Sequence, residues 1–169
     1  MIYTVDEAGN LLELAPRETL HLTKSSKRHA AVIGMILRGD GKFLIQWRAK
    51  NKLGGERLDV SATTHVRRDE TYETALQRSF QHELAITKRV PLQRMFDFKY
   101  TENLGDHMEN EYCKVFFGRY EGDYSPNSAE IDSVDFMALS EVQDFVRQKR
   151  DKATKWLRET IERIDSSMI

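Results

Sequence analysis

Glu83 is the first side chain whose position suggests chemistry. It belongs to a run, residues 71–85, that contains no Gly or Pro and repeats apolar side chains at helical spacing. At about 100° per residue it lies roughly 20° from Tyr72 on the helical wheel, so its carboxylate points from the apolar face. A buried carboxylate needs a cation, a metal or a strong hydrogen-bond donor. The plain alternative is an ion pair with one Arg or Lys.

Glu109 and Glu111 form a second acidic pair. They alternate with Asn110 in a strand-like run at 108–120, so they share one face with Cys113 and apolar neighbours. Inward carboxylates repel one another strongly unless a cation or a shared proton joins them. Glu83, Glu109 and Glu111 together therefore indicate a candidate cation site.

Three histidines accompany these acids. His65 precedes the predicted helix, and His21 and His29 precede the first core strand. Imidazole together with carboxylate suits zinc or another divalent transition metal, whereas carboxylate alone suits magnesium or manganese. Taken singly, His21 and His29 are typical of ordinary surface or strand-edge histidines.

Basic and aromatic residues offer a possible substrate site. Arg17, Arg48 and Lys52 lie in predicted loops, where they could hold a phosphate or diphosphate, although a solvated basic face is the alternative. Tyr100 and Trp156 lie on apolar stripes, so packing is their plainest role.

The elements that must position these residues are mixed strands and helices. We expect strands at 2–5, 11–14, 29–37, 42–48, 61–65, 94–101, 108–120 and 132–137, a polar connection at 17–26 and a turn at 103–106. Besides the helix at 71–85, one helix is predicted to be capped by Ser140 with Gln143 in a capping box, and the last to start at Asp151. This order predicts an α/β fold with helices on the faces of a mixed sheet.

Composition limits the classes of protein. With 169 residues, 40% of them apolar, the chain can bury a real core, and we expect one domain over residues 1–169. Its net charge of −1 argues against a nucleic-acid-binding protein. The single cysteine, Cys113, excludes an intramolecular disulfide and a multi-cysteine zinc site. Without a basic leader or an apolar run of ~20 residues, we expect a soluble, cytoplasmic protein with no membrane contact.

Residues 70–86 resemble a degenerate Nudix box. Glu70 stands at the first Glu of that motif, Arg78 follows at the usual spacing, and Glu83 keeps the last Glu. The departures are Thr64 at the opening Gly, and Ser79 and His82 at two Glu positions. The resemblance implies the Nudix fold, a mixed β-sheet sandwiched between helices. In a Nudix pyrophosphatase the missing carboxylates hold magnesium.

A second resemblance is more specific. Glu109-Asn110-Glu111-Tyr112-Cys113-Lys114-Val115-Phe116 is similar to the Glu-Asn-Glu-X-Cys-X-Val-Phe strand of type I isopentenyl diphosphate isomerase, a Nudix-fold family that also lacks those carboxylates. His29-Ala30-Ala31 resembles that family's His-X-Ala-Phe strand entry. The likeness covers about residues 2–165.

This resemblance implies a metal centre, two cofactors and a small-molecule diphosphate substrate. One divalent metal, Mn²⁺ or Zn²⁺, would be held beside the reacting double bond by His21, His29, His65, Glu109 and Glu111. A Mg²⁺ ion, held partly by Glu83, would bridge to the diphosphate, with Arg17, Arg48 and Lys52 at basic positions around it.

The resemblance also assigns the reacting groups. Glu111 matches one acid/base, Thr63 stands at the position of the catalytic cysteine, and Tyr100 and Trp156 match the aromatic groups around the carbocation. A family Arg near the diphosphate appears here as Ser79. A threonine hydroxyl ionises far less readily than a thiol, so Thr63 is a poor general base without an activating neighbour.

Three functions remain open from the sequence. The first is an isomerase of an allylic or homoallylic diphosphate, with Glu111 and a metal-bound water sharing the proton transfers. The second is a Nudix hydrolase of a nucleoside or isoprenoid diphosphate, with Glu70, Glu83, Glu109 and Glu111 as magnesium ligands. The third is a binder that keeps the site without the chemistry. Each is compatible with a monomer or a homodimer.

Overall fold

The structure, a computed structural model, describes residues 1–23 and 27–169. The strands are β1 (Ile2–Val5), β2 (Leu11–Ala15), β3 (His29–Leu37), β4 (Lys42–Arg48), β5 (Leu58–Asp59), β6 (Ala62–His65), β7 (Leu92–Leu104), β8 (His107–Arg119) and β9 (Ile131–Ala138). The helices are α1 (Arg17–Leu20), α2 (Tyr72–Leu84), α3 (Leu139–Gln148) and α4 (Lys155–Ile161), with short 3₁₀ turns at Arg150–Lys152 and Ser166–Met168. In the described part of the chain, no helix has the length and apolar character needed to cross a membrane.

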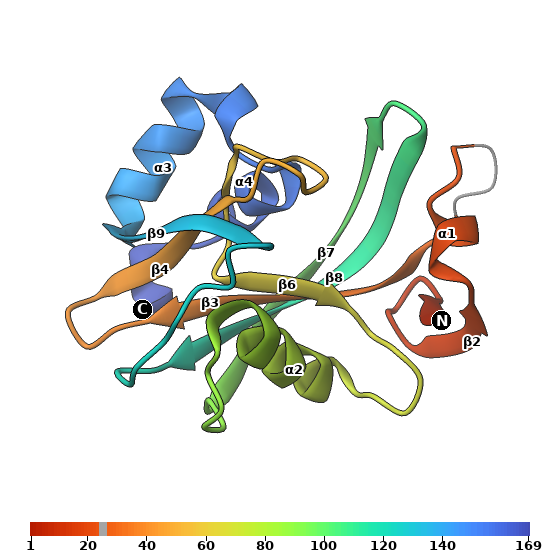
Figure 1. The fold of residues 1–169 in the computed structure, drawn as a ribbon, viewed down its shortest axis with the longest axis horizontal. Coiled ribbons are helices and arrows are strands. Elements are labelled where there is room, and N and C mark those ends of the chain that lie inside the picture. Colours follow the sequence, from red (N-terminus) through yellow and green to blue (C-terminus); the bar gives the residue numbers. More distant parts are fainter. Residues whose placement is uncertain (24–26) are drawn as a thin grey trace.

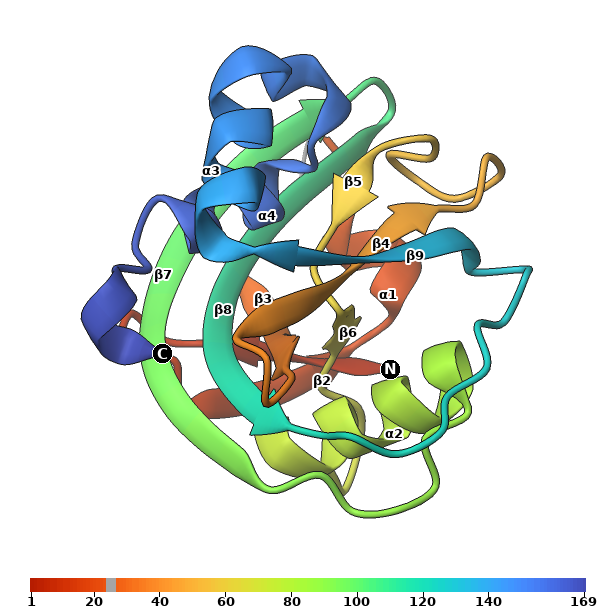
Figure 2. The same ribbon diagram turned by 90° about the vertical axis from the view of Figure 1, so that its left-hand side faces the viewer.

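The mixed sheet is built around β3. All of its residues are buried, as the continuous apolar run predicts. β8 runs parallel along β3, whereas β1, β6 and β4 pair with β3 in antiparallel fashion. β7 pairs with β8, and β5 and β9 pair with β4. Figure 2 shows β7 and β8 as a long, curved pair of strands.

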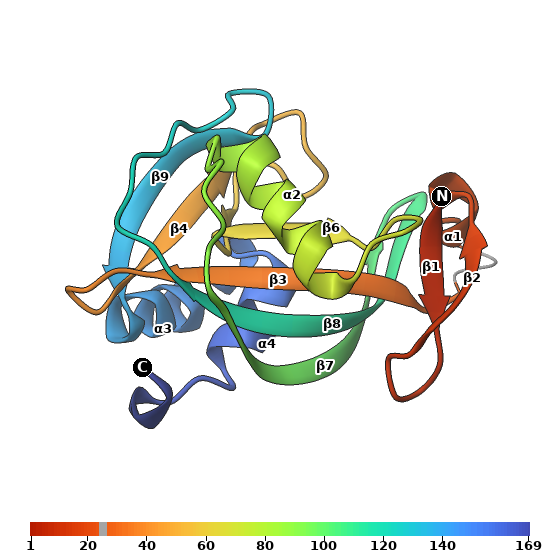
Figure 3. The same cartoon turned by 90° about the horizontal axis from the view of Figure 1, so that it is seen from below.

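Helices cover both faces of this sheet (Figure 1, Figure 3). α2 places Leu76 and Phe80 on one face, and α3 and α4 cover the other with apolar side chains that include Leu157. Gly34 in β3 permits the close approach of α2, because a Cβ atom there would lie 2.6 Å from the Phe80 ring. The predicted α/β sandwich is therefore confirmed.

Strand register brings distant residues onto one face of the sheet. His29 of β3 lies opposite Glu111 of β8, and Glu111 lies opposite Tyr100 of β7. On the other side of β3, Ala31 lies opposite His65 of β6. Because side chains alternate along strands and paired residues share a side, these residues face the same way.

Several predicted element ends were wrong. The last helix begins after Thr154 rather than at Asp151, because the Thr154 hydroxyl accepts the Leu157 N–H as a cap. Ser140 lies inside α3, whose first turn is closed by Glu141 accepting from the Ala138 N–H. Its predicted capping partner, Gln143, instead donates to the Ile164 carbonyl.

Further differences concern strand length, the first connection and β5, which was not predicted. β7 continues to Leu104, so the predicted turn at 103–106 is shorter. Of the polar connection predicted at 17–26, Arg17–Leu20 forms α1, and residues 24–26 lie outside the described residues.

Candidate metal centre and active site

His21, His29, His65 and Glu109 form a compact group of possible metal ligands. Each offers one ligand atom, and these atoms all lie within 4.8 Å of one another. They come from four segments: the end of α1, the start of β3, the end of β6 and the start of β8. Bonds of about 2.0–2.2 Å to one cation keep ligand atoms within roughly 4.4 Å of one another, so small side-chain rotations would complete a ligand set.

The hydrogen bonds of two histidines leave the nitrogen needed for a metal. His21 Nδ1 donates to the Arg17 carbonyl at 2.6 Å, and His29 Nδ1 donates to the Lys27 carbonyl at 3.0 Å. When the ring is neutral in this orientation, its lone pair lies on Nε2, as in metal-binding histidines oriented by backbone carbonyls. Both Nε2 atoms, together with Glu109 Oε2, are buried without a hydrogen-bond partner among the described residues. These groups fit a divalent cation.

Glu111 adjoins this group and also contacts the aromatic residue Tyr100. His65 Nε2 lies 2.9 Å from its Oε1, and the Tyr100 hydroxyl donates to its Oε2 at 2.8 Å. The Cys113 thiol also reaches Oε2, at 3.4 Å, and Cys113 is buried as expected.

The pKa values of Glu109 and Glu111 are shifted in opposite directions. Burial and the neighbouring charge of Glu109 raise the pKa of Glu111, so this carboxyl holds a proton more readily than usual. Burial opposes ionisation of Glu109 too, but the imidazoles of His21 and His29 outweigh it and lower the pKa of Glu109. Burial lowers the pKa of His65 to about 3, which keeps this imidazole neutral.

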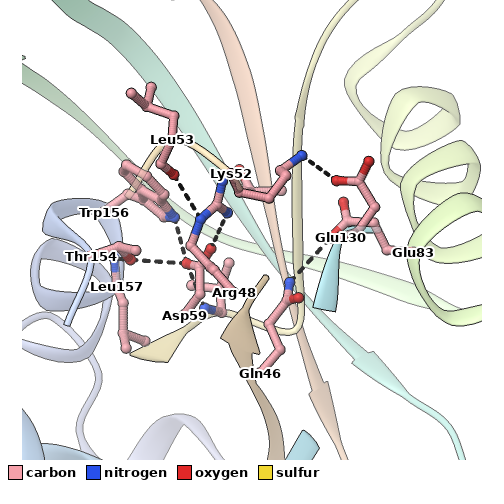
Figure 4. A network of polar contacts seen from close by, with 12 residues as sticks. Gln46, Arg48, Lys52, Leu53, Asp59, Glu83, Glu130, Thr154, Trp156 and Leu157 are labelled. Carbon is pink, nitrogen blue, oxygen red and sulfur yellow. Dashed lines mark hydrogen bonds and ion pairs between the residues drawn. The ribbon is translucent and has the colours of Figure 1, made fainter. Parts of the chain in front are cut away.

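Glu83 does not belong to the group formed by His21, His29, His65 and Glu109, called the histidine group below. It is buried, as predicted, and its oxygens accept hydrogen bonds from Ser79 Oγ and from Gln46 Nε2, the latter at 3.1 Å (Figure 4). Its partners are therefore neutral donors rather than a single Arg or Lys. Burial raises the pKa of Glu83.

The predicted basic residues differ in how freely they could bind a substrate. Arg48 is the buried last residue of β4, as the strand predicted at 42–48 implies, and it does not lie in a loop. Its Nη1 lies 2.5 Å from Asp59 Oδ2. Lys52 pairs with Glu130 (Figure 4). Arg17 starts α1, is exposed, and forms no ion pair among the described residues.

Trp156 has a polar contact that its apolar stripe does not predict. Its indole Nε1 donates to Asp59 Oδ1 at 2.5 Å, and the Thr154 hydroxyl donates to the same atom at 2.9 Å (Figure 4). The Arg48 guanidinium lies 5.2 Å from the Trp156 ring centre. The rings of Tyr100 and Trp156 are 6.2 Å apart.

A cavity of about 640 Å³ joins these parts. Its lining contains the predicted catalytic and substrate-binding side chains, namely Thr63, Glu111, Tyr100, Trp156, Arg17, Arg48 and Lys52. His65, Glu83 and Glu109 line it as well. His21 and His29 are buried and do not belong to its lining.

Thr63 reaches the cavity without an activating base. Its hydroxyl donates to the Val32 carbonyl at 3.1 Å, a bond between neighbouring strands. A hydroxyl held this way has no described partner that could take its proton.

Glu70 is not part of the cavity lining. Its carboxylate forms a two-bond ion pair with Arg78, with Oε1 2.6 Å from Nε and Oε2 3.0 Å from Nη2. Arg78 also donates to the His65 carbonyl at 3.0 Å. The pair joins the loop after β6 to α2, which is a structural role.

Three polar residues of the site were not predicted from the sequence. His107 lies 3.0 Å from Glu109, Asp59 holds Arg48 and Trp156, and Gln46 holds Glu83. Only His107 had a usable indication, since it alternates with Glu109 and Glu111 on one strand face.

Comparison with known proteins identifies the family of this chain. The NUDIX domain family matches residues 27–163. The isopentenyl-diphosphate Delta-isomerase of Roseobacter denitrificans is 31% identical over 147 residues, covering 83% of this chain and 81% of the relative. Isopentenyl-diphosphate Delta-isomerase 1 of Aromatoleum aromaticum is 27% identical over 165 residues, covering 96% of this chain and 91% of the relative.

Solved structures share the fold. DR0079 from Deinococcus radiodurans superposes with a TM-score of 0.75 at 19% identity, covering 96% of this chain and 97% of the other. The MutT NUDIX hydrolase from Burkholderia pseudomallei gives a TM-score of 0.65 at 17% identity, covering 80% of this chain and 97% of the other. The chain thus belongs to the NUDIX domain family and is an enzyme whose sequence relatives are isopentenyl-diphosphate Delta-isomerases.

Proposed function

We propose that this enzyme is a metal-dependent isomerase that moves the double bond of a small homoallylic diphosphate, as in the conversion of isopentenyl to dimethylallyl diphosphate. The main support is the convergence of His21, His29, His65 and Glu109 beside a cavity that also contains Glu111. Magnesium at a Nudix box alone would not need three imidazoles.

The cavity lining contains groups that suit both parts of such a substrate. Arg17, Arg48 and Lys52 supply positive charge for the diphosphate, and Glu83 is the carboxylate that would share a Mg²⁺ ion with it. Arg17 has no ion-pair partner among the described residues, whereas Arg48 and Lys52 pair with Asp59 and Glu130. The rings of Tyr100 and Trp156 offer π faces to a developing carbocation.

Glu111 carries the proton transfer in this proposal. In its protonated form, Glu111 would give a proton to the terminal carbon of the double bond, leaving a tertiary cation. A proton then leaves the neighbouring methylene and the double bond forms in its new place. Because Thr63 lacks an activating partner, this second step falls to the Glu111 carboxylate or to water. A divalent cation in the histidine group would supply positive charge that stabilises ionised Glu111.

Deuterium exchange tests the proposal. Isopentenyl diphosphate incubated with the enzyme in heavy water, with Mg²⁺ and either Mn²⁺ or Zn²⁺, is expected to gain deuterium and yield the dimethylallyl isomer, as followed by NMR. No label at any enzyme concentration would contradict isomerisation.

Phosphate release separates the two other functions. Release from nucleoside or isoprenoid diphosphates would indicate the hydrolase, whose proposed ligand Glu70 is engaged by Arg78 and lies outside the cavity lining. Binding of a diphosphate without exchange or release would indicate the non-catalytic binder.

A further inference from the structure

His107 is a fourth histidine beside the proposed metal centre. It is the first residue of β8 and stands two residues before Glu109, on the same strand face. Its ring centre lies 4.5 Å from that of His21, and its Nε2 lies 3.0 Å from Glu109 Oε1. Its side chain is 27% exposed, so it forms the border between the buried ligands and the cavity that it lines.

The two oxygens of Glu109 have different surroundings. Oε1 is engaged by His107, whereas Oε2 faces His21 Nε2 at 3.3 Å and His29 Nε2 at 3.8 Å. Oε2 is buried and has no hydrogen-bond partner among the described residues. An N–H donor on Oε1 therefore fixes which oxygen a cation would meet.

The backbone keeps His107 and His21 in this relation. The Met108 N–H donates to the His21 carbonyl at 2.9 Å, and Leu22 forms a β-bridge with His107. The turn that carries His21 and the tip of the β7–β8 hairpin are thus joined directly. These contacts hold the backbone of His107 beside that of His21, a proposed metal ligand.

We infer that His107 is a positioning residue of the metal centre: it donates to Oε1 of Glu109, so that this carboxylate presents Oε2 alone to a divalent transition metal. The inference rests on the proposed function, because it assumes that His21, His29, His65 and Glu109 bind a metal. Partners of this kind orient the ligand, and their loss typically weakens metal binding by roughly 10- to 100-fold.

Metal titration of the purified protein tests the inference. We compare the wild type with His107→Leu, which removes the donor, and His107→Gln, whose amide can still donate to Glu109. Zn²⁺ affinity is measured by calorimetry, and Co²⁺ binding by its visible absorption spectrum. We expect His107→Leu to bind roughly 10- to 100-fold more weakly with an altered Co²⁺ spectrum, and His107→Gln to recover most of the affinity.

A matched control and a double substitution make the result specific. His82 also contacts a glutamate, with Nε2 3.3 Å from Glu130 Oε1, but it lies outside the ligand group, so His82→Leu should leave Zn²⁺ affinity unchanged. In a Glu109→Gln background, His107→Leu should cause little further loss, since it acts through Glu109. Circular dichroism of each metal-free variant checks its fold.

The outcomes distinguish this inference from the proposed function. Wild type that binds neither Zn²⁺ nor Co²⁺ contradicts the metal centre itself. Wild-type affinity and spectrum in His107→Leu overturn the role of His107 while leaving the centre intact. Equal losses in His107→Leu and His107→Gln, with one imidazole fewer around Co²⁺ by X-ray absorption, would make His107 a direct ligand and also overturn the positioning role.

Discussion

Glu111 and Thr63 both line the cavity, but they differ in how readily their side chains can transfer a proton. Glu111 has a raised pKa and hydrogen bonds that orient both of its oxygens, whereas the Thr63 hydroxyl is committed to the Val32 carbonyl. Proton transfer from both sides of a substrate needs two groups that titrate within reach of the working pH. At the residue scale, the proposed reaction would therefore have one such group, Glu111, and a hydroxyl, Thr63, in the second place.

Thr63→Cys should raise isomerase turnover. A thiol ionises far more readily than a hydroxyl, and a positioned acid/base typically contributes about 10²- to 10⁴-fold in rate, so we expect a gain within that range in the deuterium-exchange assay. Thr63→Ser, which supplies only another hydroxyl, is the control. Adding Glu111→Gln to Thr63→Cys should abolish the gain. If Thr63→Cys leaves the rate unchanged, Thr63 is not the limiting group.

At the scale of secondary-structure elements, Asp59 of β5 links β4 to the start of α4. It ends β5, and its carboxylate accepts from Arg48 at the end of β4 and from Trp156 and Thr154 at the start of α4. All of these contacts are buried (Figure 4). Trp156 and Arg48, which both line the cavity, therefore share one supporting carboxylate.

Asp59→Asn should destabilise the fold substantially. The amide would leave buried Arg48 without its ion-pair partner and could place an N–H donor against those of Trp156 and Thr154. We therefore expect a loss of about 3–5 kcal/mol in urea unfolding. Asp135→Asn is a matched control, since Asp135 accepts from the Trp47 indole at 3.0 Å in an exposed position. That change should cost under about 1 kcal/mol. If Asp59→Asn and Asp135→Asn lose equal free energy of unfolding, the contacts of Asp59 contribute no more to stability than an exposed hydrogen bond.

The Glu70–Arg78 pair should make stability depend on pH. Although burial opposes ionisation, the Arg78 hydrogen bond lowers the pKa of Glu70 below its usual 4.5. A lowered folded-state pKa gives stability that is present above the unfolded pKa and is lost as pH falls through the folded pKa. Glu70→Gln should therefore be less stable than wild type at pH near 7, by up to about 1 kcal/mol, with a smaller difference near pH 3.

Urea midpoints at the two pH values measure this effect. Glu13→Gln removes an exposed ion pair with Lys27 and should change stability little at either pH. If the loss of stability in Glu70→Gln is the same at both pH values, the ionised Glu70–Arg78 pair does not stabilise the loop after β6.

Local patterns predicted those parts of the site that lie along single elements. Alternation along β8 correctly placed Glu109 and Glu111 together, and helical spacing placed Glu83 on the buried face. His107 was missed because the strand was predicted to start at 108, one residue late. Asp59 was missed because its partners depend on the meeting of β4, β5 and α4, and no periodicity encodes such long-range contacts.

At the scale of the whole molecule, the two faces of the sheet serve different purposes. The face under α2 packs apolar side chains, including Leu76 and Phe80. The opposite face is apolar beneath Leu157 and Ile161 of α4 and becomes polar towards His29 and Glu111. The cavity is thus a continuation of a core whose far end carries the proposed ligands, so metal binding and folding should be coupled.

Addition of a transition metal should raise the melting temperature. A cation bound only by the folded state stabilises it by about 2.7 kcal/mol at 100 times its Kd, or roughly 5–10 °C for a chain of this length. Calorimetry with Zn²⁺ or Mn²⁺, against the protein treated with EDTA, measures the shift. His29→Ala removes a buried ligand and should abolish the shift, whereas His82→Ala, on an exposed histidine, should keep it. Each variant is compared with its own EDTA-treated form, so that loss of packing at His29 does not enter the result. A wild-type melting temperature that does not respond to either metal would contradict a metal centre formed by these four segments.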